Sequence, residues 1–375
     1  MAVGSLGAGY AASIIGTTLA QPSFLTYFDL LTRSNGTQLI ATTNGLFFAG
    51  GVLGVITISW MADTWGRLCA LRVSSAVSIL VNALLAGSVN IGMFIAFRTV
   101  AGAGVFMLVA AIPLWISETA PPATRGTLAD FHSCGILLGY GLASYMGYAF
   151  FHLPTEDNVA WRGPFIVGLV PLAFHLIALS FVPESPRWLL VNRQPERAQA
   201  VLRRLHTALE ATVELQQISA AIKREKRLDS SWSAMVRKPA YLKRALISSS
   251  TVVFIESSGI LVINNYGPTI YGSLGFDKLT QLRYNMGYNT MAIAGGLLSF
   301  FIIDRVARPK LIMTGLTVCC STLIALAAIL ANFASSADDL AHPNTTALRA
   351  GVAMIYIYCL SFKFFLDGTM FAYMA

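Results

Sequence analysis

The stretch RTVAGAGVFMLVAAIPLWISETAPPATRG, residues 98–126, decides the fold of this chain. It runs from Arg98 through an apolar segment of about 20 residues, the length that a helix needs to cross the hydrocarbon core of a bilayer. A charge in that zone costs about 3 kcal/mol or more, so Arg98 is expected to face other helices or a wet cavity. Two prolines end the helix. Glu118 and Arg125 bracket these prolines and are placed to pair with charges from other loops.

Composition extends this prediction to the whole chain. Charged residues make up 12% of it, against about 25% in a soluble protein, and apolar residues make up 55%. The net charge of +8 would also suit a nucleic-acid binder, but the basic residues cluster in loops on one side of the predicted spans, as positive-inside topology produces. The five cysteines have no metal-ligand spacing. The sequence therefore predicts an all-α polytopic membrane protein without disulfides or bound zinc.

Ten apolar runs are long enough to span a membrane. They cover residues 4–22, 41–61, 71–89, 92–116, 129–151, 164–182, 245–266, 285–303, 311–333 and 349–375. Placing the amino terminus in the cytosol puts the basic loops inside, as the Lys/Arg bias requires. The same topology places both N-x-S/T sequons, at Asn35 and Asn344, outside, where glycosylation occurs. We therefore predict a multi-pass glycoprotein with a cytosolic amino terminus.

A long basic loop divides the chain into six helices and four. Within the loop, Val201, Leu205 and Leu209 recur at i, i+4 and i+8, the pattern of an amphipathic helix. We expect this helix to lie against the cytosolic face of the bundle, in preference to forming a regulatory partner site. The predicted domains are an N-terminal six-helix half at 1–182, a cytosolic loop with amphipathic helices at 183–243, and the first four helices of a C-terminal half at 244–375.

An internal repeat marks the cytosolic ends of two spans. Asp63-Thr-Trp-Gly66-Arg67 follows the second span, and Asp304-Arg-Val-Ala307-Arg308 follows the eighth with the same spacing from Asp to Arg. Repeated halves are how many secondary transporters are built. Asp63 ends its own helix, where the dipole disfavours an anion, so the amino terminus of the next helix or a cation such as Arg125 is expected to hold it. An ordinary solvated turn is the alternative; the predicted cytosolic gate comprises Asp63, Arg67, Glu118, Arg125, Asp304 and Arg308.

Four motifs, together with this repeat, point to a family. They are Gly51-x-x-Gly54 with Asp63-x-x-Gly66-Arg67, the end of the 98–126 stretch, Pro183-Glu-Ser-Pro-Arg-Trp-Leu189, and Ser258-Gly259-Ile-Leu-Val-Ile-Asn264-Asn265-Tyr266-Gly-Pro268. In sequence and position they resemble the sugar porter family of the major facilitator superfamily, in its fungal hexose or polyol type, over nearly all 375 residues. The resemblance implies a twelve-helix bundle of two six-helix halves, of which ten helices are present here, and alternating access around a midplane site. The family's second half has a glutamate that mirrors Glu118, and the chain ends before it, so we expect a truncation after the tenth helix.

Carrying the family's binding positions onto this chain changes the expected chemistry. The family's fifth-helix glutamine falls on Ser133, and the paired glutamines of helix seven fall on Ile255 and Glu256. The family's asparagine falls on Leu261. A sugar needs planar donors and acceptors, so losing several of them should change the substrate or its affinity. The predicted substrate-binding residues are Ser133, Glu256, Asn264, Asn265 and Phe371, the last at the position of the family's tenth-helix tryptophan.

The family's proton-coupling pair is incomplete. In proton-driven members an aspartate follows Gly-Tyr in helix one and pairs with the arginine that begins helix four. Here Ala11 follows Gly9-Tyr10, while Arg98 remains. The resemblance therefore implies a facilitator.

Four charges are predicted inside the membrane: Arg98, Glu256, Lys363 and Asp367. Each would be costly against lipid, so all are expected to face the interior of the bundle. For Glu256, Lys363 and Asp367 two interpretations stay open. They form an ion pair or a three-way pair that holds helices together, or they contact the substrate.

The resemblance implies transmembrane transport of a hexose or related polyol at the plasma membrane, by facilitated diffusion in preference to proton symport. The sequence contains no nucleotide-binding loop and no paired Ser/His/Asp context, so an enzyme, a cofactor and a metal site are not expected. The expected partners are a small-molecule sugar or polyol and membrane lipid, with neither nucleic acid nor an obligate protein partner.

Three other interpretations stay open. A carrier of a hydroxylated organic acid such as quinate would use Arg98 and Lys363 as cationic contacts. A non-transporting nutrient sensor would keep the binding fold and signal through cytosolic segments. An inactive fragment would result if the reading frame stops after ten helices.

Overall fold

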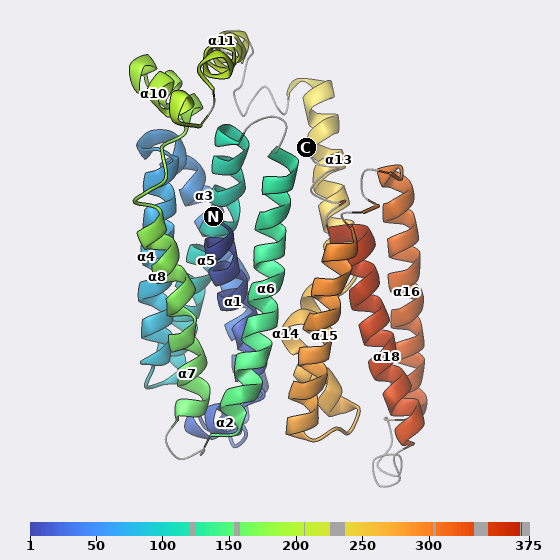
Figure 1. The fold of residues 1–375 in the computed structure, drawn as a ribbon. Coiled ribbons are helices and arrows are strands. Elements are labelled where there is room, and N and C mark those ends of the chain that lie inside the picture. Colours follow the sequence, from blue (N-terminus) through green and yellow to red (C-terminus); the bar gives the residue numbers. More distant parts are fainter. Residues whose placement is uncertain are drawn as a thin grey trace.

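A computed structural model describes residues 1–120, 125–153, 158–205, 207–225, 237–299, 301–302, 305–333, 344–367 and 369. All regular secondary structure in these residues is helical, which confirms the predicted all-α class. Figure 1 shows long helices that run roughly side by side, with α10 (Pro195–Leu205) and α11 (Ala208–Glu225) beyond one end of them.

The first half of the chain forms one bundle with a continuous hydrophobic core. Two details were not predicted: the short α2, which begins with a proline, and the division of the sixth span at Gly168. The second follows because Pro171 has no N–H to donate to the carbonyl of Val167. The helices of this bundle are α1 (Ala2–Thr18), α2 (Pro22–Tyr27), α3 (Gly36–Trp65), α4 (Arg67–Ala86), α5 (Ile91–Thr119), α6 (Arg125–Phe151), α7 (Val159–Val167) and α8 (Leu169–Ala178).

The second half forms another bundle around a second core, to which Leu137 of α6 contributes. Its seventh span is broken at residues 257–259, where Gly259 has a φ of +98° that favours glycine. The last helix of this bundle passes into a π-helix. The helices are α13 (Pro239–Glu256), α14 (Ile260–Ser273), α15 (Lys278–Ser299), α16 (Arg308–Phe333), α18 (Thr345–Ser361) and the π-helix η1 (Phe362–Asp367).

The long helical segments match the ten predicted apolar runs, with ends that differ by several residues. Among the described residues, eight segments are long and apolar enough to cross a membrane. The other two are α1, which has 17 residues, and α15, whose first half carries Gln281, Arg283 and Asn285. Length and apolarity thus located all ten helices, although two of them are weaker spans by themselves.

The segment between the two bundles forms an arm of three helices, α9 (Pro186–Val191), α10 and α11. The amphipathic helix predicted through Val201, Leu205 and Leu209 is wrong in register. The backbone N–H and hydroxyl of Thr207 donate to the Glu210 carboxylate at 3.1 and 2.8 Å, which starts a new helix. Leu205 and Leu209 are consequently exposed, and the residues that pack inward are Ala198, Leu202, Ala211 and Ile222.

Glycines allow close approach between helices of the first bundle. A Cβ added at Gly50 of α3 would overlap the carbonyl oxygen of Thr99, and one at Gly102 of α5 would overlap the carbonyl oxygen of Phe47. The α3 and α5 backbones are therefore in direct contact, as small residues permit in membrane helices.

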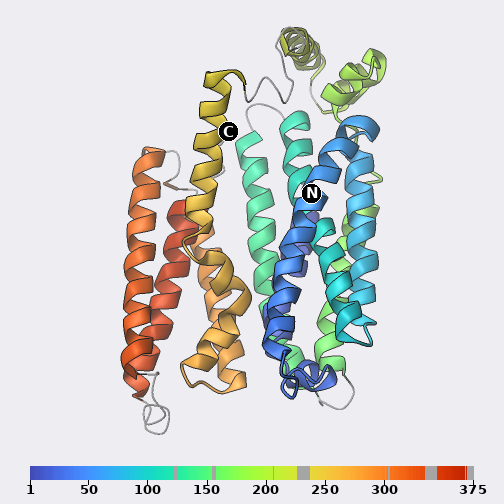
Figure 2. The same ribbon diagram turned by 180° about the vertical axis from the view of Figure 1, so that it is seen from behind.

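The two bundles meet mainly through α6 and α15, with a smaller contact between α1 and α14. Figures 1 and 2 show these helices in the middle of the molecule, with the remaining helices on either side. Tyr145 Oη and Thr290 Oγ1 lie 2.9 Å apart across the contact. The interface between the bundles is thus narrow compared with the core of either bundle.

The two sequons lie at the end of the bundles opposite the arm. Asn35 immediately precedes α3, close to α2, and Asn344 caps α18 by accepting a hydrogen bond from Ala347 N at 3.2 Å. In Figure 1, α2 and the start of α18 are at the bottom, whereas α10 and α11 are at the top. The arm and the sequons therefore lie on opposite sides of the bundles.

Candidate functional site

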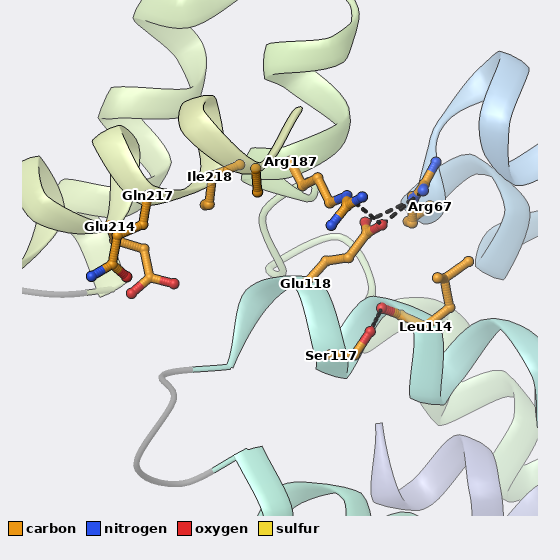
Figure 3. Close-up of a pocket in the computed structure, with 9 residues that line it drawn as sticks. Arg67, Leu114, Ser117, Glu118, Arg187, Glu214, Gln217 and Ile218 are labelled. Atoms are coloured by element: carbon orange, nitrogen blue, oxygen red, sulfur yellow. Dashed lines mark hydrogen bonds and ion pairs between the residues drawn. The ribbon is translucent and has the colours of Figure 1, made fainter. Parts of the chain in front are cut away.

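A network of charged side chains lies at the end of the first bundle that carries the arm (Figure 3). Arg67, the first residue of α4, donates two hydrogen bonds to the Glu118 carboxylate of α5, Nε to Oε2 and Nη2 to Oε1, each 2.8 Å long. Only 11% of the Arg67 side chain and 8% of the Glu118 side chain are exposed. Such a bidentate pair fixes both side chains in one geometry, and its burial makes the loss of either partner costly.

Glu184, from the segment before α9, binds the amino terminus of α4. Its carboxylate accepts from the backbone N–H of Arg67 at 3.0 Å and of Leu68 at 3.2 Å, where the helix dipole favours an anion. Gly66 has a φ of +100°, and a Cβ there would lie 2.6 Å from Glu184 Oε2. This turn therefore requires glycine for two reasons, its backbone conformation and the closeness of the carboxylate.

Two partners were expected for Asp63, the amino terminus of α4 or a cation such as Arg125. The first is wrong, because Glu184 occupies the amino terminus, and the cation that pairs with Asp63 is Arg67. Asp63 Oδ1 instead lies 3.1 Å from Arg67 Nη1, and 76% of the Asp63 side chain is exposed. Asp63 belongs to the last turn of α3 and points outward there, so it cannot reach the N–H groups of the helix that follows. Its carbonyl oxygen accepts a hydrogen bond from Trp188 Nε1 at 2.9 Å.

Ser185 and Arg187 connect the network to the arm. Ser185 Oγ donates to Glu118 Oε2 at 2.6 Å. Arg187 Nε lies 4.0 Å from Glu118 Oε1, and Arg187 Nη2 lies 2.6 Å from Glu225 Oε2 at the end of α11. The 183–189 motif thus joins α5 and α11 through one arginine.

A cavity of about 640 Å³ lies between this network and α11. Glu118, Arg67 and Arg187 meet on one side of it, while Glu214 and Gln217 reach toward it from α11 (Figure 3). Charges of both signs face the cavity. A lining with both signs of charge suits ion pairs among the lining side chains that can exchange partners. It suits a single charged ligand less well.

Of the other three predicted gate residues, two lie wholly or partly outside the described residues. Asp304 is outside them, and so is the side chain of Arg125, whose backbone begins α6. Arg308 is exposed at the start of α16. The structure therefore brings together three of the six predicted gate residues, Asp63, Arg67 and Glu118, on the first bundle.

Arg98 is fully buried in the first bundle. Its Nη1 and Nη2 donate to the carbonyl oxygens of Ala11 and Ala12 at 2.9 and 3.2 Å, and its guanidinium carbon lies 3.9 Å from the centroid of the Phe47 ring. The arginine therefore faces other helices. Backbone oxygens and an aromatic face hold the cation at the position where the family resemblance would supply a carboxylate.

A second group of charges gathers around η1. Lys363 Nζ lies 3.2 Å from Asp367 Oδ2, and only 8% of the Lys363 side chain is exposed. Glu256, the last residue of α13 before the helix break, interacts electrostatically with both. Tyr140 of α6, in the other bundle, interacts electrostatically with all three. We call Tyr140, Glu256, Lys363 and Asp367 the interior cluster; it combines a broken helix with a π-helix, and π-helical turns are frequent at functional sites.

The other predicted binding residues are more dispersed. Ser133 is half-buried on α6, beside His132. Asn264 and Asn265 are half-buried on α14, and Asn265 Nδ2 donates to the carbonyl oxygen of Leu261 in its own helix at 2.8 Å. Phe371 lies outside the described residues. Glu256 is thus the predicted binding residue that the structure places in the interior cluster.

Sequence reasoning missed Glu184 and Tyr140. Glu184 lies in the 183–189 motif, but its role depends on a loop that returns to α4 from more than a hundred residues away. Tyr140 is an aromatic residue in an apolar helix, and nothing in the sequence around it indicated a functional role. Among the described residues, no group of three or more His, Cys, Asp or Glu side chains could hold a metal ion.

Known proteins share both the sequence pattern and the fold. The family described as "Sugar (and other) transporter" matches residues 1–375. The MFS-type transporter criB of Aspergillus cristatus is 28% identical over 93% of this chain and 74% of its own length. A quinate permease of Neurospora africana is 29% identical over 82% of this chain and 61% of its own length.

The fold is similar to that of the xylose transporter XylE from E. coli in a partially occluded inward-open conformation. The TM-score is 0.77 at 19% sequence identity, and the match covers 100% of this chain and 84% of that chain. This similarity shows the fold, a pair of packed helical bundles. The matching transporter family and the apolar helices together define an integral, multi-pass membrane protein.

The chain belongs to the Sugar (and other) transporter family. The family resemblance seen in the motifs is thereby confirmed. Members of this family and fold are membrane transporters and not enzymes, and the chain is a transporter of sugars or other metabolites.

Proposed function

We propose that the protein moves a hexose or a related polyol across the plasma membrane by alternating access, with its amino terminus and its arm in the cytosol. The observation that carries this proposal is the interior cluster, because it places polar groups from both bundles around a break in a membrane helix. In secondary transporters, broken helices near the midplane form the substrate site, and the two halves rock around it. The narrow contact between α6 and α15 suits such a motion.

The charged network at the arm supports the cytosolic gate in this proposal. Arg67, Glu118 and Glu184 hold the ends of α4 and α5 together. When the second bundle approaches this face, its charged loop would meet a surface whose ion pairs are already fixed in geometry. These groups would be buried from water when the gate is closed and exposed when it is open. That difference is how an ion-pair gate biases the equilibrium between the two conformations of a transporter.

A hydroxylated organic acid is the second candidate substrate, and the quinate permease relative supports it. Lys363 would supply the cationic contact. Against it, Lys363 is already paired with Asp367 at 3.2 Å and also interacts electrostatically with Glu256. An added carboxylate would therefore compete with the Asp367 carboxylate for this cation.

The test is uptake of labelled hexoses and polyols into proteoliposomes that contain the purified chain. We expect saturable uptake of a neutral sugar or polyol that excess quinate does not inhibit. Glu256→Gln should raise KM more than it lowers the maximal rate, because it changes a contact to the substrate and leaves the Lys363–Asp367 pair in place. If quinate inhibits uptake and glucose does not, a hydroxylated organic acid becomes the favoured substrate. Absence of flux for every neutral compound would refute the proposal.

We further propose facilitated diffusion, because Ala11 stands where a proton-driven carrier would place its carboxylate and Arg98 is held by backbone oxygens. Initial uptake rates into the same proteoliposomes should be unchanged, within about 20%, when an imposed pH gradient is collapsed while the membrane potential is clamped. Accumulation above the external concentration that depends on the gradient would contradict it.

A further inference from the structure

Two arginines bind carbonyl groups just beyond the last residue of α8, at the end of the bundle that carries the arm. Arg72 Nη2, from α4, donates to the carbonyl oxygen of Leu179 at 3.2 Å. Arg204 Nη2, from α10, donates to the carbonyl oxygen of Phe181 at 3.4 Å. A helix carboxyl terminus attracts cations, and these contacts fix both guanidinium groups within one turn of the same helix end.

Most of the hydrogen-bonding capacity of these arginines remains unused within the described part of the chain. Both side chains are exposed, and a guanidinium has five N–H donors. No ion pair joins Arg72 or Arg204 to a carboxylate among the described residues. The two cations therefore present donors outward, at the level where α8 leaves the membrane.

An exposed apolar stripe leads along α8 to this point. Val170, Phe174 and Ile177 of α8 are 68%, 60% and 63% exposed, and their spacing of four and three residues puts them on one face. Phe181, which is 74% exposed, follows just beyond the end of α8. From Val170 to its last residue, Ala178, α8 rises about 12 Å, against about 15 Å for half of the hydrocarbon core. The stripe and Phe181 thus extend along most of one leaflet.

An apolar groove of about 370 Å³ adjoins the lower part of the stripe. It lies between α1, α6 and α8, and its lining residues are all apolar, among them Leu6, Leu142, Val170 and Phe174. Val170 and Phe174 belong to both the groove and the stripe. An extended apolar chain could therefore follow α8 from the groove to Phe181 without meeting a polar side chain of that face.

We propose that this surface is a binding site for one anionic phospholipid, with its headgroup phosphate on Arg72 and Arg204 and an acyl chain along the α8 stripe into the groove. Guanidinium groups favour phosphate through paired N–H donors. Anionic lipids concentrate in the cytosolic leaflet. Placing the site in that leaflet rests on the proposed function, which puts the arm in the cytosol; the rest of the proposal does not depend on it. The apolar stripe is what distinguishes a lipid from a soluble phosphate as the occupant.

The experiment measures the thermal unfolding midpoint of the full chain in a neutral detergent during titration with phosphatidylserine. Phosphatidylcholine with the same acyl chains tests the headgroup, and glycerophosphoserine, which has no acyl chains, tests the tail. We expect phosphatidylserine to raise the midpoint at concentrations where the other two have no effect. In the double variant Arg72→Gln/Arg204→Gln the half-saturating concentration should rise about 25-fold, since each arginine near an anionic lipid contributes about 5-fold.

The matched control is Lys223→Gln/Arg224→Gln, which removes two charges from the exposed end of α11 and should keep the normal response. If the double variant does not fold, Phe181→Asp tests the same site, because it leaves both arginines in place and supplies them with an internal carboxylate; it should abolish the effect of phosphatidylserine. Equal responses to both lipids, or equal losses in the variant and the control, would refute the site. A full response to glycerophosphoserine would show a soluble-anion site and refute the lipid. None of these readouts requires transport, so their failure is separate from failure of the proposed function.

Discussion

Glu118→Gln is expected to lower the free energy of unfolding by about 3 kcal/mol, because it removes the buried charge partner of Arg67 and leaves the guanidinium with the exposed Asp63 carboxylate. The glutamine keeps the shape of the side chain but replaces one acceptor oxygen with a donor, so one of the two 2.8 Å hydrogen bonds is lost. Ser185 Oγ also loses a charged acceptor. The change can be measured from thermal or denaturant unfolding of the purified protein in detergent.

Glu225→Gln is the matched control for this substitution. It breaks the other ion pair of Arg187, but 38% of the Arg187 side chain and 52% of the Glu225 side chain are exposed. An exposed pair of this kind contributes less than about 1 kcal/mol. Equal effects of the two substitutions would mean that burial of the Arg67–Glu118 pair does not determine its contribution.

Gly102→Ala is expected to destabilise the first bundle by about 3 kcal/mol. The new methyl group would overlap the carbonyl oxygen of Phe47 on α3. A backbone carbonyl cannot rotate away as a side chain can, so α3 and α5 must separate, and overpacking costs rise with such shifts. Separation would also loosen the contact between Arg98 and the Phe47 ring. Unfolding in detergent and the yield of folded protein measure the effect.

Gly45→Ala provides the comparison within α3. A Cβ at Gly45 meets no atom within 4 Å, and alanine favours a helix over glycine by up to about 1 kcal/mol. This variant should be as stable as the parent or slightly more stable. If both alanines destabilise the protein equally, loss of chain flexibility rather than helix spacing would explain the result.

The spans were predictable because a membrane helix depends on one simple property, an apolar run of sufficient length. The misses are local. The break between α7 and α8 depends on a proline whose effect competes with continuing hydrophobicity, and the arm changes register because Thr207 and Glu210 form a cap. The hydrophobic periodicity predicted one helix that continues through Thr207, but α10 ends before Thr207 and α11 begins after it.

The members of the charged network were more predictable than their pairing. Their sidedness and repeat placed Asp63, Arg67 and Glu118 together, and the structure brings them together. Which carboxylate binds which donor depends on how the loop before α9 returns to α4, and sequence spacing carries no information about that path. The interior cluster shows the same limit: the cost of buried charge predicted that Lys363 and Asp367 face inward, but not that Tyr140 lies with them.

The burial of α1 has a consequence for biogenesis. Most of its residues are buried. Two of its three main neighbours, α6 and α8, follow it by more than a hundred residues in the chain, and the third, α5, begins at Ile91. Translation therefore delivers a short, glycine-rich helix long before the surfaces that enclose it exist. The order of synthesis is opposite to the order of burial, so α1 must wait at the insertion machinery or in lipid until α6 and α8 arrive.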